Sequence, residues 1–271
     1  MFKPGRQVSS HRNLRSPEND KNPFRERIAR ASRERSSRII LAIDIDRGPS
    51  TRGLKQAHQL LDKTVQYLCG VKISRQTVLN LGTRNTALLA KRVHDNDVPC
   101  IVDDKVNDIG NTNRAIAEAY FRLGLDALTA NPFAGWKEGL EPLFQTAHKT
   151  GRGVILLVYM SHPGAAEGYG QMVMLDRSKR PRSQYILFAE KAVKWKADGA
   201  VVGATRPRIV KEVKTVLGGK VPIYSPGVGA QGGDLRRALE AGTDYFIIGR
   251  SITKDPRPEH AAERYASAST E

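Results

Sequence analysis

Residues 99–108 read PCIVDDKVND, a short apolar run that passes directly into charged side chains. Apolar runs of this length are typical of parallel β-strands that are buried on both faces. Asp103, Lys105 and Asp108 lie at the point where such a strand ends. Charged groups are costly to bury beside an apolar strand, so their presence there indicates a functional site.

The same pattern of a short apolar run followed by polar residues recurs along the rest of the chain. Eight such strands, with helical segments between them, predict an α/β fold, namely a (β/α)8 TIM barrel in a single domain. The predicted strands are Ile39–Asp44, Gly70–Ile73, Pro99–Asp103, Ala127–Ala130, Val154–Tyr159, Ala200–Gly203, Val221–Ser225 and Tyr245–Ile248.

Amphipathic segments with helical spacing connect these strands, and one more follows the last strand. They are Leu54–Leu68, Asn85–His94, Asn113–Leu123, Trp136–His148, Tyr185–Lys196, Pro207–Leu217, Asp234–Glu240 and Pro258–Tyr265. An open doubly wound sheet is the structural alternative, but Asp44–Gly48 does not match a Gly-rich dinucleotide-binding loop. Turns that combine Gly and Asp precede three strands, at Gly124–Asp126, Asp198–Gly199 and Gly242–Asp244.

The 271 residues carry a net charge of +16, which is unevenly distributed. Residues 1–38 hold eleven Lys or Arg and four Asp or Glu. We predict that residues 1–37 form a basic N-terminal extension, poorly ordered or docked on the surface, and that residues 38–271 form the barrel. RNA binding through this tail is a functional alternative. No aromatic residues for base stacking are interleaved in Arg25–Arg38, so we expect no nucleic-acid partner.

The chain shows no feature of a membrane or secreted protein. The longest apolar run, Val154–Met160, is far too short to span a bilayer, and the first residues lack the apolar part of a signal peptide. Cys69 and Cys100 have no CxxC partner and no metal-ligand spacing, which is typical of reduced, buried thiols. We therefore expect a cytoplasmic protein without a membrane partner.

Further candidate site residues follow from the predicted fold, because the active site of such a barrel lies at the carboxyl ends of its strands. They are Asp44, Lys72, Ser161, Pro226, Gly227, Val228, Gly229, Gln231, Gly249 and Arg250. The Gly-rich loop can bring backbone N–H groups close to an anion, and Arg250 adds a bidentate cation. The loops after the last two strands commonly bind phosphate in this fold, so we predict a phosphate site there.

The charged residues near the third strand suggest a particular chemistry. Asp103 and Lys105 are two residues apart, so their side chains project to the same side of an extended strand. Between Asp103 and Asp108, Lys105 would stay protonated and act as a held cation and proton donor. Asp44 and Lys72 could extend these groups into an alternating array of charges. The two aspartates could also ligate Mg²⁺, but Lys105 already supplies positive charge, so we expect no metal ion.

Several segments, in order from about residue 39 to 255, resemble the orotidine 5′-phosphate decarboxylase family. They are Leu41–Asp44, Val71–Ile73, Asp103–Ile109, Thr112, Met160–Gly164, Ser225–Gln231 and Gly249–Ile252. The Asp-x-Lys-x-x-Asp motif alone is shared with sugar-phosphate decarboxylases and aldolase-type synthases. Together with Met-Ser-His-Pro-Gly and Pro-Gly-Val-Gly-Ala-Gln, it is specific to the decarboxylases.

The resemblance implies an enzyme of pyrimidine synthesis that converts orotidine 5′-phosphate to UMP and CO₂ without a cofactor. It implies that Lys105 donates a proton to C6 of the pyrimidine and that Asp103 faces the carboxylate that leaves. Asp44 and Lys72 are similarly implied to contact the ribose hydroxyls and to complete the charged array.

The resemblance also implies a substrate-binding role for three further side chains and a second subunit. Ser161 is implied to contact the pyrimidine, Gln231 to bridge base and phosphate, and Arg250 to hold the phosphate. A homodimer is implied because some residues are expected to reach the active site of the other subunit. These residues are Asp108, Ile109 and Thr112.

Three segments depart from the family pattern, and one alternative on the same barrel stays open. The end of the fourth strand, Thr129–Phe133, is one variant among several in the family, so no role is carried onto it. The basic extension is not part of the shared pattern, and residues 168–182 are longer and more basic than expected. A sugar-phosphate decarboxylase or aldolase-type synthase would use Mg²⁺ with acidic ligands near the second strand. Lys72 occupies that strand here, which favours the decarboxylase.

Overall fold

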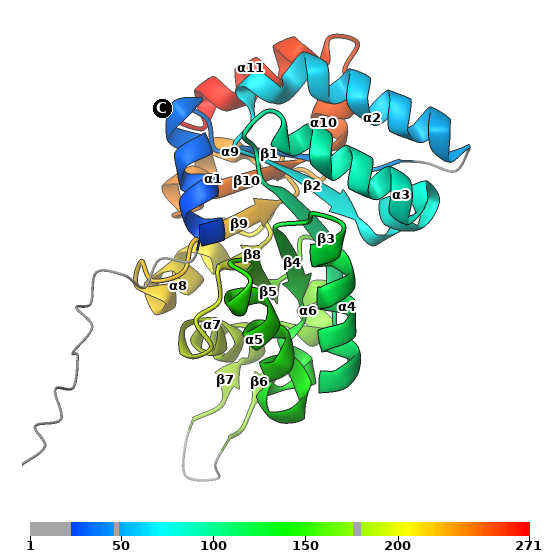
Figure 1. Cartoon of the computed structure of the whole chain (residues 1–271). Helices are drawn as coiled ribbons and strands as arrows, with labels where there is room; N and C mark the ends of the chain where they lie inside the picture. The colour runs from blue at the N-terminus through cyan, green and yellow to red at the C-terminus, as the bar shows by residue number, and fades with distance from the viewer. Residues whose placement is uncertain (1–22, 46–48, 176–179) are drawn as a thin grey trace, which may run out of the picture.

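The computed structural model describes residues 23–45, 49–175 and 180–271, and its centre is a closed barrel of parallel strands (Figure 1). The strands follow one another around the barrel in the order β1-β10-β9-β8-β5-β4-β3-β2. They are β1 (Ile39–Ile43), β2 (Gly70–Ser74), β3 (Cys100–Val106), β4 (Ala127–Ala130), β5 (Gly153–Tyr159), β8 (Gly199–Val202), β9 (Ile223–Pro226) and β10 (Tyr245–Ile248). The predicted (β/α)8 barrel is therefore confirmed, and the open doubly wound sheet is excluded.

Helices surround the barrel, and eight of them correspond to the predicted segments. They are α2 (Ser50–Thr64), α3 (Arg75–His94), α4 (Gly110–Arg122), α5 (Glu141–Lys149), α7 (Gln184–Lys194), α8 (Pro207–Leu217), α9 (Leu235–Glu240) and α11 (Pro258–Ala268). The predicted start of α3 at Asn85 was wrong by ten residues. Ser74 caps the helix by accepting from the Thr77 N–H at 3.1 Å, and Gly82, with φ of 72°, interrupts it before the predicted start.

Shorter elements lie between the main ones. They are η2 (Val65–Tyr67), η3 (Pro132–Ala134), the π-helical turn η4 (Trp136–Leu140), α6 (Ala165–Gly168), α10 (Arg250–Thr253) and the paired strands β6 (Met172–Val173) and β7 (Arg182–Ser183). The strand β6 and the first residue of β7 belong to the basic stretch 168–182, of which residues 176–179 lie outside the described part. Among the described helices, none is long and apolar enough to cross a membrane.

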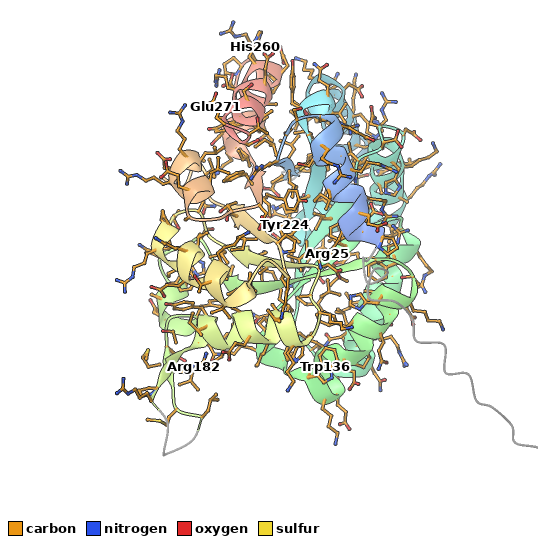
Figure 2. The ribbon with its side chains drawn as sticks, turned by 90° about the vertical axis from the view of Figure 1, so that its left-hand side faces the viewer. Arg25, Trp136, Arg182, Tyr224, His260 and Glu271 are labelled. Atoms are coloured by element: carbon orange, nitrogen blue, oxygen red, sulfur yellow. The ribbon has the colours of Figure 1, made fainter. Side chains whose placement is uncertain are left out.

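Helix α1 (Pro23–Glu34) lies within the stretch expected to be an extension, and it packs against the barrel. Its side chains Phe24, Ile28 and Ala31 are buried in the core. Phe24 lies so close to Gly153, the first residue of β5, that a Cβ there would overlap the ring. Figure 2 shows α1 running over this side of the barrel, where Arg25 and Tyr224 are labelled. Residues 1–22 of the expected extension lie outside the described part.

The three turns that combine Gly and Asp tie neighbouring strands together at the amino-terminal end of the barrel. Each aspartate stands directly before a strand and accepts a backbone N–H at the start of the strand beside it. The Oδ2–N distances are 2.8 Å for Asp126 and Cys100, 2.9 Å for Asp198 and Val154, and 2.8 Å for Asp244 and Ile223. A basic side chain pairs with each aspartate, namely His94, His148 and Lys214. These contacts fix the relative positions of the strands far from their carboxyl ends.

Replacing Phe24 with alanine tests whether α1 belongs to the core. We expect Phe24→Ala to lower the free energy of unfolding by about 3–5 kcal/mol, because it removes a fully buried ring and leaves a cavity. Urea denaturation measures this change, and Arg33→Ala on the exposed side of the same helix is the control. Equal unfolding free energies for the two variants would show that α1 is not part of the core.

Candidate active site

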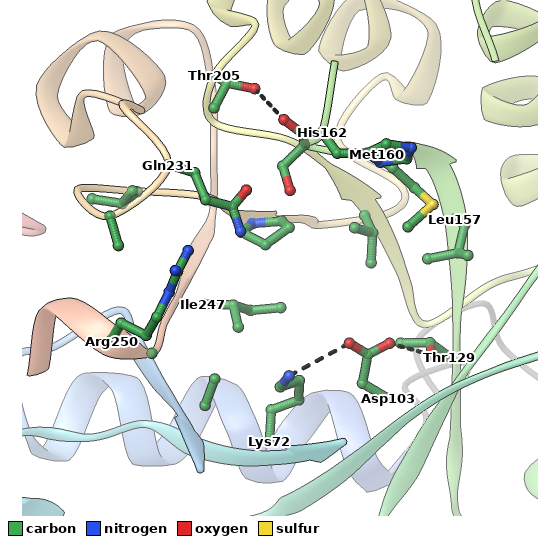
Figure 3. Close-up of a pocket in the computed structure, with 18 of the residues that line it drawn as sticks. Lys72, Asp103, Thr129, Leu157, Met160, His162, Thr205, Gln231, Ile247 and Arg250 are labelled. Atoms are coloured by element: carbon green, nitrogen blue, oxygen red, sulfur yellow. Dashed lines mark hydrogen bonds and ion pairs between the residues drawn. The ribbon is translucent and has the colours of Figure 1, made fainter. Parts of the chain in front are cut away.

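A cavity of about 880 Å³ opens at the carboxyl ends of the barrel strands (Figure 3). Most of the predicted site residues line it, although they come from distant parts of the chain. Those that do are Asp44, Lys72, Asp103, Lys105, Ser161, Pro226, Gly227, Val228, Gln231, Gly249 and Arg250. The described residues contain no group of three or more His, Cys, Asp or Glu side chains arranged to hold a metal ion.

Four charged side chains form an alternating array at one end of this cavity. The Lys72 Nζ lies 3.7 Å from Asp44 Oδ1 and 3.5 Å from Asp103 Oδ2. The Lys105 Nζ lies 2.8 Å from the other carboxylate oxygen, Asp103 Oδ1. Asp103 therefore stands between two ammonium groups, and each of its oxygens faces one of them.

The Asp103 carboxylate is mostly buried, with 20% of its side chain exposed, and yet its surroundings favour the charged form. Burial acts to raise the pKa of Asp103, while the positive charges of Lys72 and Lys105 act to lower it. Hydrogen bonds from Lys105 and Thr129 lower it further, and the net result is a pKa below the ordinary value of an aspartate. Asp103 is therefore ionised at neutral pH and holds both lysines in place.

An irregular stretch of β3 directs these side chains toward the cavity. The pairing of β3 with β4 shifts register between Val102 and Val106, which is a bulge in the ladder. Within the bulge, Lys105 has a positive φ of 58°, which is unusual for a residue with a side chain. Asp104, between the two cavity residues, is buried on the other side and pairs with Arg75. Asp103 and Lys105 thus both face the cavity, as expected, but a bulge and not a regular strand places them there.

Asp108 does not join the array within one chain, contrary to the expected acid–lysine–acid cluster. Its backbone N–H donates to Asn113 Oδ1 at 3.0 Å, and its Oδ1 accepts from the Ile109 N–H at 2.7 Å. Asp108 is exposed and Ile109 is 66% exposed, and neither lines the cavity. Thr112 is half-buried in the first turn of α4 and also lies outside the cavity lining.

The predicted phosphate end of the cavity is formed by the loops after β9 and β10. Gly227 has a φ of 97°, and a Cβ there would lie 3.0 Å from the Ser161 Cβ and 3.1 Å from Gln231 Oε1, so glycine allows this close approach. Figure 3 shows Gln231 and Arg250 on the opposite side of the cavity from Asp103. Gly229 packs instead against the hydroxyl of Ser251, outside the cavity lining.

The structure adds cavity residues that the sequence analysis did not assign. Thr129 donates a hydrogen bond to Asp103 Oδ1 at 2.9 Å, and its position inside the apolar strand Ala127–Ala130 was the available signal. Thr205 and Arg206 follow β8 and also line the cavity. The Thr205 hydroxyl donates to the Ser161 carbonyl at 3.0 Å. Thr205 and Arg206 follow a short apolar strand, and this is the same signal that identified the other site residues.

The closed barrel and the charged cavity at the carboxyl ends of its strands are those of a (β/α)8-barrel enzyme. The chain belongs to the orotidine 5′-phosphate decarboxylase / HUMPS family, whose model matches residues 37–265. This match confirms the resemblance predicted from the sequence motifs.

Relatives and solved structures agree with this assignment. The chain is 35% identical to an orotidine 5′-phosphate decarboxylase of Methanosarcina mazei over 84% of this chain and 93% of the relative. It superposes on an orotidine 5′-monophosphate decarboxylase from Methanocaldococcus jannaschii, complexed with the inhibitor BMP, with a TM-score of 0.72, 27% identity and coverage of 87% and 99%. The OMP decarboxylase of Leishmania donovani has a TM-score of 0.77 at 21% identity, with coverage of 90% and 96%, and is similar in fold.

Proposed function

We propose that this protein is a carboxy-lyase that converts orotidine 5′-phosphate to UMP and CO₂ in pyrimidine synthesis. The observation that carries the proposal is the alternating array Asp44–Lys72–Asp103–Lys105 at one end of a cavity whose other end holds Gln231 and Arg250. Such a cavity suits a substrate with a reacting carbon at one end and a phosphate at the other. The named decarboxylases among the relatives support the same activity.

The array would stabilise the charge that develops during the reaction. Loss of CO₂ from C6 leaves an electron pair in the plane of the pyrimidine, where the ring cannot delocalise it. A fixed ammonium at that point stabilises localised negative charge, and Lys105 is the candidate for it. Lys105 then delivers a proton to C6, which completes the product. Asp103 would face the substrate carboxylate and hold the ammonium groups in position.

The other cavity residues would bind the parts of the substrate that do not react. Arg250 and the glycine loop around Gly227 would hold the phosphate, and Gln231 would bridge phosphate and base. Asp44 and Lys72 would contact the ribose hydroxyls, and Ser161 the pyrimidine. Binding energy from these contacts would orient C6 against Lys105.

The alternative of a sugar-phosphate decarboxylase or aldolase-type synthase is less well supported. Such an enzyme would need acidic Mg²⁺ ligands at the second strand. In this chain Lys72 occupies that strand, and its ammonium lies between two carboxylates. The second strand therefore supplies a cation instead of an acidic ligand.

The same proposal includes a homodimer in which Asp108, Ile109 and Thr112 complete the site of the other subunit. Asp108 is exposed and lies outside the cavity of its own chain. Two large apolar side chains, Leu79 on α3 and Ile109 directly before α4, are 75% and 66% exposed. A second copy that reaches the cavity through Asp108 and Ile109 would also remove apolar surface from water.

We also propose a cytoplasmic enzyme without a nucleic-acid partner. Four arginines of the basic extension lie on α1, and acidic groups pair with two of them. Arg27 pairs with Asp126 at 2.9 Å, and Arg30 lies 3.8 Å from Glu34. The array and the phosphate end of the cavity account for a function that does not need the tail.

Replacing Lys105 tests the proposed proton donor. We expect Lys105→Ala to lower kcat by about 10³-fold or more, because it removes both the stabilising charge and the proton. The decrease in orotidine 5′-phosphate absorbance measures turnover, and UMP binding shows that the cavity is intact. Lys63→Ala, an exposed lysine on α2, is the control. Near-normal turnover in Lys105→Ala would refute the assignment.

Replacing Arg250 tests the proposed phosphate site. We expect Arg250→Ala to weaken UMP binding by about 10- to 100-fold, because it removes charge-assisted hydrogen bonds to the phosphate. The affinity for uridine, which has no phosphate, should stay the same. Calorimetry measures both affinities, with exposed Arg84→Ala as the control. An unchanged affinity for UMP would contradict the phosphate role.

Mixing two inactive variants tests the proposed contribution of Asp108 to the other subunit. In a mixed dimer of Lys105→Ala and Asp108→Ala, one site carries both changes and the other carries neither. We expect coexpression to restore about a quarter of the wild-type activity, since half of randomly formed dimers would have one intact site. Lys105→Ala with Asp103→Asn should restore nothing, because both residues belong to the same chain's site. Equal activity in the two mixtures would argue against the shared site.

A further inference from the structure

We propose that Thr129 is a positioning residue for the reaction, whose hydroxyl fixes the Asp103 carboxylate and the backbone of Lys105 at the same time. This inference rests on the proposed decarboxylase function. The hydroxyl donates to Asp103 Oδ1 at 2.9 Å and accepts from the Lys105 N–H at 2.9 Å. One side chain on β4 therefore connects the two groups on β3 that would perform the chemistry.

The place of Thr129 in the fold leaves its hydroxyl few other partners. All four residues of β4 are buried, and Thr129, with 2% of its surface exposed, is the one with a polar side chain. A buried hydroxyl is costly without hydrogen bonds, and Thr129 satisfies this need on the neighbouring strand. A valine of similar shape would fit an apolar strand equally well, so packing alone does not explain the hydroxyl.

The bulge in β3 explains why a hydroxyl is needed at residue 129 of the neighbouring strand. In the ladder, Val102 pairs with Leu128 and Val106 pairs with Ala130, so three residues of β3 face the single residue Thr129. Regular backbone pairing cannot be maintained across such a mismatch. The Lys105 N–H donates to the Thr129 side chain within the bulge. The hydroxyl thus replaces part of the pairing that the bulge interrupts.

The backbone conformation of Lys105 makes this hydrogen bond important. Its φ of 58° is in the left-handed region, which is disfavoured for a residue with a Cβ. Such a conformation persists where the surroundings hold it, and the bond to Thr129 is a direct constraint on that peptide group. If the peptide group relaxed, the ammonium of Lys105 would lose its alignment with the reacting carbon.

The orientation of the Asp103 carboxylate depends on the same hydroxyl. Asp103 Oδ1 accepts from both Thr129 and the Lys105 Nζ, while Oδ2 faces Lys72. The hydroxyl has a single proton, which it donates to Asp103. Its oxygen therefore accepts from the Lys105 N–H. The hydrogen bond from Thr129 also contributes to the lowered pKa of Asp103. Loss of the hydroxyl would therefore release the position of this carboxylate and raise its pKa.

The test compares Thr129→Val, which keeps the shape and removes the hydroxyl, with Thr129→Ser, which keeps the hydroxyl. We expect Thr129→Val to lower kcat by about tenfold or more, since a hydrogen bond to a charged group is lost. The KM for orotidine 5′-phosphate and the affinity for UMP should change little. The acid side of the pH profile of kcat should move to higher pH, because Asp103 without this bond is protonated at higher pH. Thr129→Ser should restore both kcat and the profile.

Thr86→Val is a matched control, because Thr86 is a fully buried threonine on α3 whose hydroxyl has no hydrogen-bond partner in the described part of the chain. It should leave kcat and the pH profile unchanged. If Thr129→Val does not fold, Thr129→Cys keeps the size and donates only weakly, and the same results are expected. A wild-type kcat and pH profile in the folded Thr129 variant would overturn the inference. Absence of turnover in the wild type would instead refute the proposed function.

Discussion

The ionised carboxylate of Asp103 is the group on which the rest of the cavity depends. It is mostly buried, and it keeps its charge because two ammonium groups and a hydroxyl surround it. Without it, Lys72 and Lys105 would be like charges in a partly desolvated space and would repel each other. The carboxylate therefore offsets the repulsion between two lysines that lie close together beside the apolar barrel interior.

The barrel provides this arrangement by departing from regular geometry at one point. A regular β3 would pair with β4 along its whole length, but the bulge between Val102 and Val106 leaves residues 103–105 out of the regular ladder. Asp103 and Lys105 then face the cavity, while Asp104 turns to the outer side and pairs with Arg75. The unusual backbone conformation of Lys105 therefore coincides with the side chain that we propose as the proton donor, as is common in active sites.

Much of the fold and site could be predicted because a short stretch of sequence marks each strand and most site residues. The eight strands are apolar runs of regular spacing, and Asp103, Lys105 and Arg250 are charged residues directly after such runs. Helix α1 was not recognised as part of the core, because Phe24, Ile28 and Ala31 have helical spacing but share the helix with six charged residues.

Two features of the site could not be predicted from spacing. The spacing of three residues groups Asp108 with Lys105, but Asp108 lies just before α4, is held by contacts with Ile109 and Asn113, and does not line the cavity. Thr129 looked like an ordinary strand residue, because its role depends on a bulge in the neighbouring strand that no sequence pattern marks. In both cases the decisive information is the path of the backbone in space.

The aspartates that precede β4, β8 and β10 influence which substitutions this protein can accept during evolution. Asp126, Asp198 and Asp244 anchor strand starts at the end of the barrel opposite to the cavity. Sites that are far apart and share no partners change stability and activity almost independently. The loops around the cavity can therefore accept substitutions that alter ligand preference, while the strand register is kept by residues that no ligand touches.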